Sequence, residues 1–169
     1  ELNGLSKINM EQKRIWKNSM YSLKTVDDAT WDKIVDASPQ GTIFSETRWL
    51  ALFGPQPPHY AVYKGDQLVG GFSGFEKYTP LTPFQGILTI PNGGNLESLH
   101  HGVAEALMPC LPAEVYCHYS YPDIRPFLWA GYEAKVKYTY VVDISDLDKA
   151  WERMDKDTRN LIGNTSCED

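Results

Sequence analysis

The chain has 169 residues, of which 42% are hydrophobic and 22% charged, and its formal net charge is −6. This length and composition are typical of a single globular domain with its own core, and the negative charge argues against a nucleic-acid partner. Because no apolar run approaches the ~20 residues that span a bilayer, and the N-terminus lacks the apolar centre of a signal peptide, we expect a cytoplasmic protein without a membrane partner.

Residues 1–19 are expected to be a leader, either flexible or added by cloning, ahead of a domain that starts at Met20. Within residues 1–24, five side chains are basic and two are acidic. A short nucleic-acid-binding arm is the alternative interpretation, and it requires an affinity that disappears when residues 1–19 are removed.

The first half of the domain shows clear local signals. Alternation predicts a strand over residues 21–26, and a helix over 27–39 is expected to bury Trp31, Ile34 and Val35. A second, short helix is expected between a Ser45 cap and Gly54.

Residues 59–78 read as an antiparallel hairpin whose turn uses the positive φ of Gly65, and residues 86–90 as a third strand. Gly70, Gly71 and Gly74 lie inside the second strand of the hairpin. We interpret them as sites of close backbone packing or of a bulge, because a phosphate-binding loop needs a helix directly after it.

In the second half, Asn95 is expected to cap a helix whose apolar face runs from Leu96 to Leu111. Four further elements follow, namely a strand over 114–120, a short helix over 122–131, a long strand over 132–144 and a helical, charged segment over 145–164. This order predicts an α/β fold with a mixed sheet, partly antiparallel and partly parallel, flanked by helices.

The cysteines and histidines do not indicate a metal site. The three cysteines lack the CxxC spacing of a zinc site and suit small buried hydrophobes in a reducing compartment. His100 and His101 are neighbours, so on a helix they point ~100° apart and cannot both face one ion. We therefore expect structural roles for both residues and for His118.

Several segments resemble the GNAT acyltransferase superfamily. The hairpin AVYKGDQLVGG and the late PFLWAGYE helix resemble GNAT elements, whereas IFSETRWLALFG, TPFQG and DKDTRNLI together look like the first domain of FemAB-like aminoacyltransferases, which build peptidoglycan bridges. The resemblance covers residues 21–162. It implies a GNAT-like fold, transfer of an acyl or aminoacyl group to an amine, and an acyl-CoA or aminoacyl donor.

The chain departs from the family's pattern where the donor would bind. GNAT members that use acyl-CoA carry Arg or Gln, two residues, Gly, one residue and Gly or Ala before the third helix, but this chain reads IPNGGN with Ile90 first. The resemblance therefore leaves the backbone donors of Gly93, Gly94 and Asn95 as the cofactor-binding candidates. The late-helix tyrosine that protonates the leaving thiolate is replaced by Phe127, so Tyr119 or Tyr121 would have to substitute.

The resemblance also bears on domains and partners. It implies a GNAT-like domain over 20–154, with residues 155–169 as a helix and tail that lead into a missing second domain. In FemAB-like enzymes the first domain helps hold the acceptor, so the expected partners are a small-molecule acceptor, a second GNAT-like domain or a second copy in a homodimer.

The uncharged turn TPLTPFQGIL carries the remaining substrate or partner candidates: Thr82, Phe84 and Gln85. Its prolines pre-set the turn, so contact with an acceptor is one interpretation and packing of Phe84 in its own core is the other. Arg125 either grips a carboxylate or phosphate or pairs with Asp123 or a nearby Glu. Tyr138 and Tyr140 share one strand face, as core or as substrate platform.

Two functions follow. The first is a GNAT-like or FemAB-like transferase domain with a degenerate acyl-CoA site. The second is a non-catalytic module of the same fold that binds a small molecule or a protein.

Overall fold

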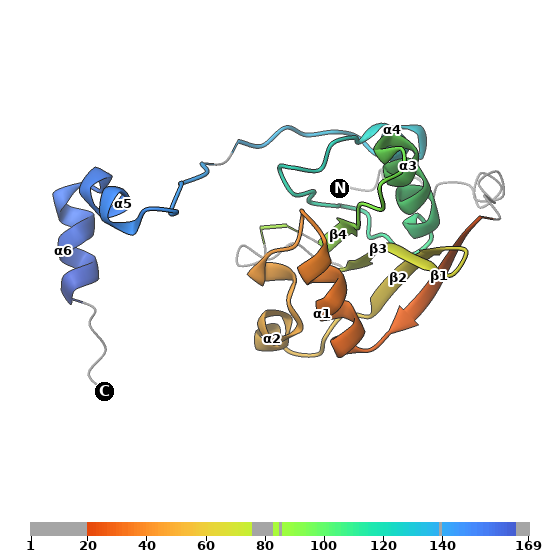
Figure 1. The fold of residues 1–169 in the computed structure, drawn as a ribbon, viewed down its shortest axis with the longest axis horizontal. Helices are drawn as coiled ribbons and strands as arrows, with labels where there is room; N and C mark the ends of the chain where they lie inside the picture. The colour runs from red at the N-terminus through yellow and green to blue at the C-terminus, as the bar shows by residue number, and fades with distance from the viewer. Residues whose placement is uncertain (1–19, 76–82, 85, 139, 165–169) are drawn as a thin grey trace, which may run out of the picture. The chain divides into compact units, whose positions relative to one another are not determined.

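The computed structural model describes residues 20–75, 83–84, 86–138 and 140–164 (Figure 1). The chain divides into two compact units, residues 1–134 and 135–169, and each is described by itself. The expected boundary between residues 154 and 155 falls inside the second unit. No helix in the described ranges is long and apolar enough to cross a membrane.

The first unit is built on a four-stranded sheet in the order β1-β2-β3-β4, and all its neighbouring strands are antiparallel. The strands are β1 (Tyr21–Val26), β2 (His59–Lys64), β3 (Gln67–Ser73) and β4 (Gly86–Thr89). The prediction of a sheet flanked by helices is therefore confirmed. The expected parallel pairing is wrong for the described strands, because each one returns directly beside its predecessor.

The β2–β3 hairpin matches its prediction in detail. Gly65 has φ 60°, which the turn requires, and the register shifts so that Val69 has no partner in β2. A Cβ at Gly71 would lie 2.4 Å from the backbone oxygen of Tyr60. Close backbone packing is thus confirmed at Gly70 and Gly71, and the bulge falls at the neighbouring Val69. Gly74, which was expected inside the strand, lies beyond its end at Ser73.

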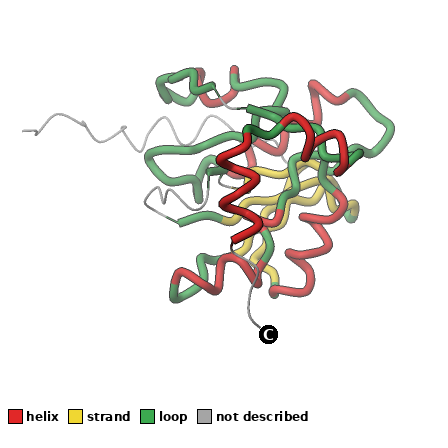
Figure 2. The backbone as a smooth tube through the Cα atoms, turned by 90° about the vertical axis from the view of Figure 1, so that its left-hand side faces the viewer, coloured by secondary structure: helices red, strands yellow, loops and turns green. Residues whose placement is uncertain are grey.

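Two helices pack against opposite faces of the sheet, whose strands are drawn in yellow in Figure 2. Helix α1 (Asp28–Ala37) is capped by Asp27, whose carboxylate accepts the Thr30 N–H at 2.8 Å. It buries Trp31, Ile34 and Val35 as predicted. Helix α3 (Leu96–Leu107) begins at Asn95, whose side chain accepts the Ser98 N–H at 2.9 Å.

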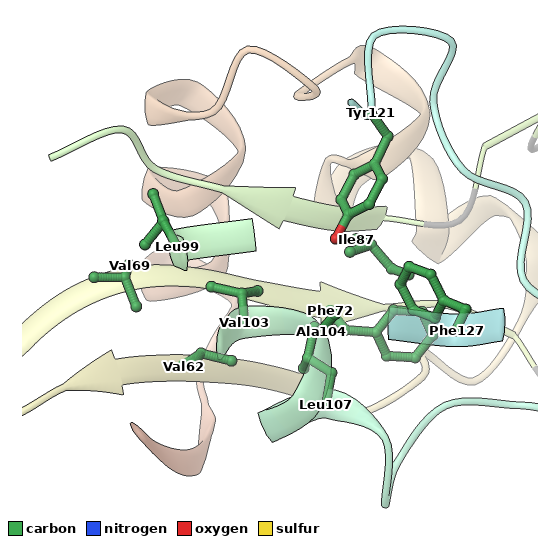
Figure 3. Packing of buried hydrophobic residues seen from close by; sticks show 10 residues of the cluster. All are labelled: Val62, Val69, Phe72, Ile87, Leu99, Val103, Ala104, Leu107, Tyr121 and Phe127. Atoms are coloured by element: carbon green, nitrogen blue, oxygen red, sulfur yellow. The ribbon is translucent and has the colours of Figure 1, made fainter. Parts of the chain in front are cut away.

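The main core lies between α3 and its face of the sheet (Figure 3). Leu99, Val103 and Leu107 project from the helix toward the strand residues Val62, Val69, Phe72 and Ile87. The helix ends four residues before the predicted Leu111, because Pro109 has no N–H with which to continue the hydrogen-bond ladder.

The expected short helix after Ser45 starts later than predicted. It is divided into α2 (Thr47–Leu50) and the 3₁₀ turn η3 (Ala51–Phe53), after another such turn, η2 (Ile43–Ser45). Asp32 of α1, and not Ser45, supplies the N-terminal cap, because its carboxylate accepts the Thr47 N–H at 2.9 Å and hydroxyl at 2.7 Å.

The outer edge of β4 is occupied by a buried amide. The Gln40 side-chain oxygen accepts the Thr89 N–H at 3.1 Å, the Thr89 hydroxyl at 2.8 Å and the Ser38 hydroxyl at 3.0 Å. Gln40 is only 4% exposed, so this contact ties the segment after α1 to the edge of the sheet.

Two predicted strands are wrong. Residues 114–120, and the described residues of 132–144, form no strand. A strand needs the backbone of a neighbour, and neither segment pairs with one here. The expected late helix is present as α4 (Arg125–Trp129), followed by Gly131 at φ 93°, and the helical C-terminal segment as α5 (Leu147–Arg153) and α6 (Lys156–Asn164).

Replacing Gly71 by Ala should lower the free energy of unfolding by about 1–3 kcal/mol, because the new methyl meets backbone and not a movable side chain. Urea denaturation measures the change. Gly94→Ala is the matched control: its Cβ would meet only a side-chain oxygen, Asn92 Oδ1, at 3.2 Å, so it should cost less than about 0.5 kcal/mol. Equal costs for the two variants would contradict the close packing.

Candidate functional site

Helix α3 and the segment 118–125 that follows it bring several sequence candidates together. Tyr121 packs on His100, with ring centroids 5.5 Å apart. Asp123 contacts His101, and Arg125 contacts Glu97 one turn earlier on the same helix. The site is therefore one face of α3 with this segment laid against it.

An ionic network joins α3 to the start of α4. Asp123 Oδ2 and His101 Nε2 lie 2.7 Å apart, and the Arg125 Nε donates to Asp123 Oδ1 at 2.9 Å. An Arg125 terminal nitrogen also donates to Glu97 and, at 2.6 Å, to Asp123 Oδ2. Of the two roles expected for Arg125, pairing with Asp123 and a nearby Glu is the one observed.

The network sets the charge of its members. The hydrogen bonds from Arg125 hold the pKa of the Asp123 carboxyl well below its usual range, so this carboxyl stays ionised. The same bonds raise the pKa of Arg125. The side chains of Asp123 and His101 are only 12% and 21% exposed, whereas Arg125 is half exposed.

A hollow of about 380 Å³ lies on the outer surface of α3 beside this network. Glu97, His101 and Glu105 line it at four-residue spacing, which places them on one side of the helix, and Asn95, Ser98 and Gly102 complete the lining. A Cβ at Gly102 would lie 2.2 Å from the Tyr21 ring, so a larger residue there would force that ring to move. The hollow is open to solvent and rich in carboxylates.

A metal ion does not fit this network as it stands. Ligand atoms of Glu97, His101 and Asp123 lie within 4.8 Å of one another. However, the Arg125 guanidinium already bonds to both carboxylates, and His101 Nε2 is bonded to Asp123. An ion would have to displace both contacts, so the expected lack of a metal site stays a prediction.

The general-acid candidates differ in exposure. Tyr121 is 8% exposed and packs with Phe127 in the core (Figure 3), where its hydroxyl has no hydrogen-bond partner among the described residues. Burial raises its pKa, so it stays protonated, but its hydroxyl does not open onto the hollow. Tyr119 is 61% exposed and is free to meet a ligand.

The Phe84 ring contacts Tyr119, one of the two general-acid candidates. This half-buried ring contacts His118 and Tyr119 at centroid distances of 4.7 and 6.2 Å. Phe84 therefore packs partly on its own unit, as one of the two interpretations expected. Thr82 and Gln85 lie outside the described residues, and Tyr138 is 96% exposed in the second unit. Tyr140 is 98% exposed, so neither tyrosine is buried within that unit by itself.

The donor-loop candidates lie at the N-terminus of α3, as expected. Gly93 has φ 77° and Asn95 is the helix cap. Two N–H groups at this end are already used, since Asn92 Oδ1 accepts from Gly94 at 3.2 Å and Asn95 Oδ1 accepts from Ser98 at 2.9 Å. With the Glu97 carboxylate in the first turn as well, this helix end is poorly suited to a pyrophosphate.

A second polar cluster is structural. His59 is 4% exposed, stacks on Trp31, and has its Nδ1 2.8 Å from Ser73 Oγ and its Nε2 3.5 Å from Asp28 Oδ1. The residue types are those of a Ser-His-Asp relay, but the two ring nitrogens are exchanged, since Nδ1 and not Nε2 contacts the serine. In addition, Ser73 is 2% exposed while the Asp28 side chain is 66% exposed. A nucleophilic serine must instead be the exposed member, since its oxygen must reach the substrate.

Sequence reasoning gave His101 a structural role, named Asp123 only as a partner of Arg125, and did not select Glu97 or Glu105 by number. The four-residue spacing of the three α3 residues was a usable signal, because it predicts one polar face on a helix whose opposite face is apolar. The pairing of His101 with Asp123 spans 22 residues and had no local signal.

Of the three cysteines, Cys167 lies outside the described residues, and the other two are half-buried. Cys110 and Cys117 are unbridged, and burial raises the pKa of each thiol to about 11, so neither is a thiolate near neutral pH.

Comparison with protein-family models, curated proteins and solved structures finds no match for this chain. The class of protein therefore has to be argued from the fold and the site alone.

Acidification should destabilise the protein below about pH 6.5. Burial lowers the pKa of His59, His100 and His118 from 6.5, so the unfolded chain binds protons more readily than the folded one. Their contribution is complete above that pH and is lost as the pH falls through the folded values. Urea unfolding at several pH values tests this, and His100→Phe should flatten the dependence. An unchanged slope in that variant would contradict the assignment for His100.

Tyr121→Phe should leave the free energy of unfolding unchanged or raise it by up to about 1 kcal/mol, because a buried hydroxyl without a partner contributes only a desolvation cost. Thermal and urea denaturation measure the effect. A loss above about 1 kcal/mol would mean that the hydroxyl has a hydrogen-bond partner in the folded protein.

Proposed function

We propose that this chain is a transferase-type domain of GNAT-like organisation that holds the amine acceptor of an acyl or aminoacyl transfer and does not grip acyl-CoA in the ordinary way. The observation that carries the proposal is the carboxylate-lined hollow on α3, where Glu97 and Glu105 flank His101. A primary amine is cationic near neutral pH and is attracted by the Glu105 carboxylate, whereas Glu97 is already paired with Arg125.

The order of elements supports the same class. One strand, two helices, three antiparallel strands and a helix follow one another in the first unit, which is the succession that the sequence resemblance implies for the first part of a GNAT-like domain. The end of α3 that would receive a donor's pyrophosphate instead carries the Glu97 carboxylate and two side-chain caps. A donor would therefore have to be held elsewhere or by another domain.

A non-catalytic binding module is the second candidate function. The observation in its favour is the position of Tyr121, because a hydroxyl buried among Phe127 and His100 does not reach a leaving group. Such a module would bind an amine in the same hollow without transferring anything to it.

Calorimetric titration separates the donor and acceptor assignments. We expect 1,5-diaminopentane to bind saturably and Glu105→Gln to weaken it about twofold to fivefold, since an exposed ion pair contributes about 0.2–1 kcal/mol. Asp66→Asn, which removes an exposed carboxylate at the β2–β3 turn, is the matched control and should bind normally. Acetyl-CoA should give no saturable heat.

The reverse pattern would overturn the proposal. Saturable acetyl-CoA binding that falls in Gly93→Val, with no diamine binding, would assign the helix end to a donor, because Val is strained at the φ of 77° there.

A further inference from the structure

The protonation of His101 follows from its neighbours. Arg125 keeps Asp123 ionised, and an ionised carboxylate only accepts hydrogen bonds. The 2.7 Å contact between His101 Nε2 and Asp123 Oδ2 therefore requires the proton on Nε2. In the neutral imidazole the lone pair is then on Nδ1.

The Nδ1 atom is available to a ligand. Within the described residues it has no hydrogen-bond partner. The buried side-chain atoms without a partner are Thr42 Oγ1, His100 Nδ1 and Tyr121 Oη. Since His101 Nδ1 is not one of these, it is unpaired without being buried. His101 also lines the hollow on α3. The residue that carries this lone pair thus lines the surface that the proposed function assigns to the amine.

The ring is held in place on more than one side. Asp123 fixes Nε2, and the Trp129 ring stands edge-on to the imidazole with centroids 5.4 Å apart at 87°. Asp123 is itself held by Arg125 through its backbone N–H at 3.0 Å as well as its side chain. The imidazole is therefore positioned before any ligand arrives, as a general base requires.

We infer that His101 is the general base of this site, and that its Nδ1 removes a proton from an acceptor ammonium bound in the hollow on α3. This inference rests on the proposed function. The Nδ1 lone pair forms a bond to the proton, the electrons of the broken N–H bond stay on the amine nitrogen, and the amine becomes a nucleophile. The imidazolium keeps its Nε2–H bond to Asp123, whose negative charge offsets the new positive charge.

Asp123 and Arg125 are positioning residues in this scheme. Asp123→Asn should disrupt it in a specific way. Because Arg125 offers only donors, the Asn side chain would turn its oxygen toward the guanidinium and its NH₂ toward His101. Nε2 would then accept a hydrogen bond, and the proton would move to Nδ1. A purely structural ion pair makes no such prediction about the tautomer.

Nitrogen NMR of the full chain labelled in its four histidines tests the inference. The signal of His101 is assigned by its loss in His101→Gln. We expect the Nε2–H tautomer in the unsubstituted protein and the Nδ1–H tautomer in Asp123→Asn. Titration with 1,5-diaminopentane should shift the Nδ1 signal saturably, with the same midpoint as the calorimetric titration, and Asp66→Asn should behave like the unsubstituted protein.

The outcomes test the general-base role of His101 separately from the proposed amine site. An Nδ1–H tautomer in the unsubstituted protein, or calorimetric binding of the diamine without any shift at Nδ1, overturns the base and leaves the amine site standing. Failure of the diamine to bind overturns the proposed function and the base with it. An unchanged tautomer in a folded Asp123→Asn variant overturns the positioning role of Asp123, and the measurements on the unsubstituted protein decide the base even where that variant does not fold.

Discussion

The indole of Trp31 is fully buried and lies directly over two glycines of the sheet. A Cβ at Gly71 or at Gly86 would come within 3.1 Å of its ring. Its N–H donates to the Ser45 carbonyl at 2.7 Å, and His59 stacks against it with the rings 6° from parallel. This one side chain therefore determines how far α1 lies from the sheet. The course of the chain after α1 and the orientation of His59 depend on it as well. On the opposite face, Gly70 gives Val103 of α3 the same close approach.

The parts of the fold that could be predicted are those whose signals are local. The β2–β3 hairpin, the buried face of α1 and the Asn95 cap each depend on residues within one turn or one helix. The late segments 114–120 and 132–144 also alternate, and they were expected to be strands. Alternation specifies two faces but not a neighbour, and these segments lack a paired backbone in the described chain.

The candidate site was predictable only in pieces. Arg125 and Asn95 could be selected from charge isolation and cap chemistry, and both lie beside the hollow. His101 was expected to be structural, because its adjacency to His100 was weighed only as a possible metal site and not as a possible general base. Its chemistry depends on Asp123, and that contact exists only once the segment after α3 folds back along the helix. A tertiary contact of this kind leaves no periodic mark in a single sequence.

The buried amide of Gln40 has a consequence for how copies of this protein meet. An unpaired strand edge is a template on which a foreign strand can grow, and short chains with open edges aggregate by that route. Along β4, the N–H of Thr89 that a newcomer would use is already committed to an oxygen that accepts three hydrogen bonds inside the protein. An incoming strand would have to expel that side chain before gaining its first bond at Thr89. Gln40 thus hinders strand addition at Thr89 with a neutral, buried side chain, where many sheets use an exposed lysine for the same purpose.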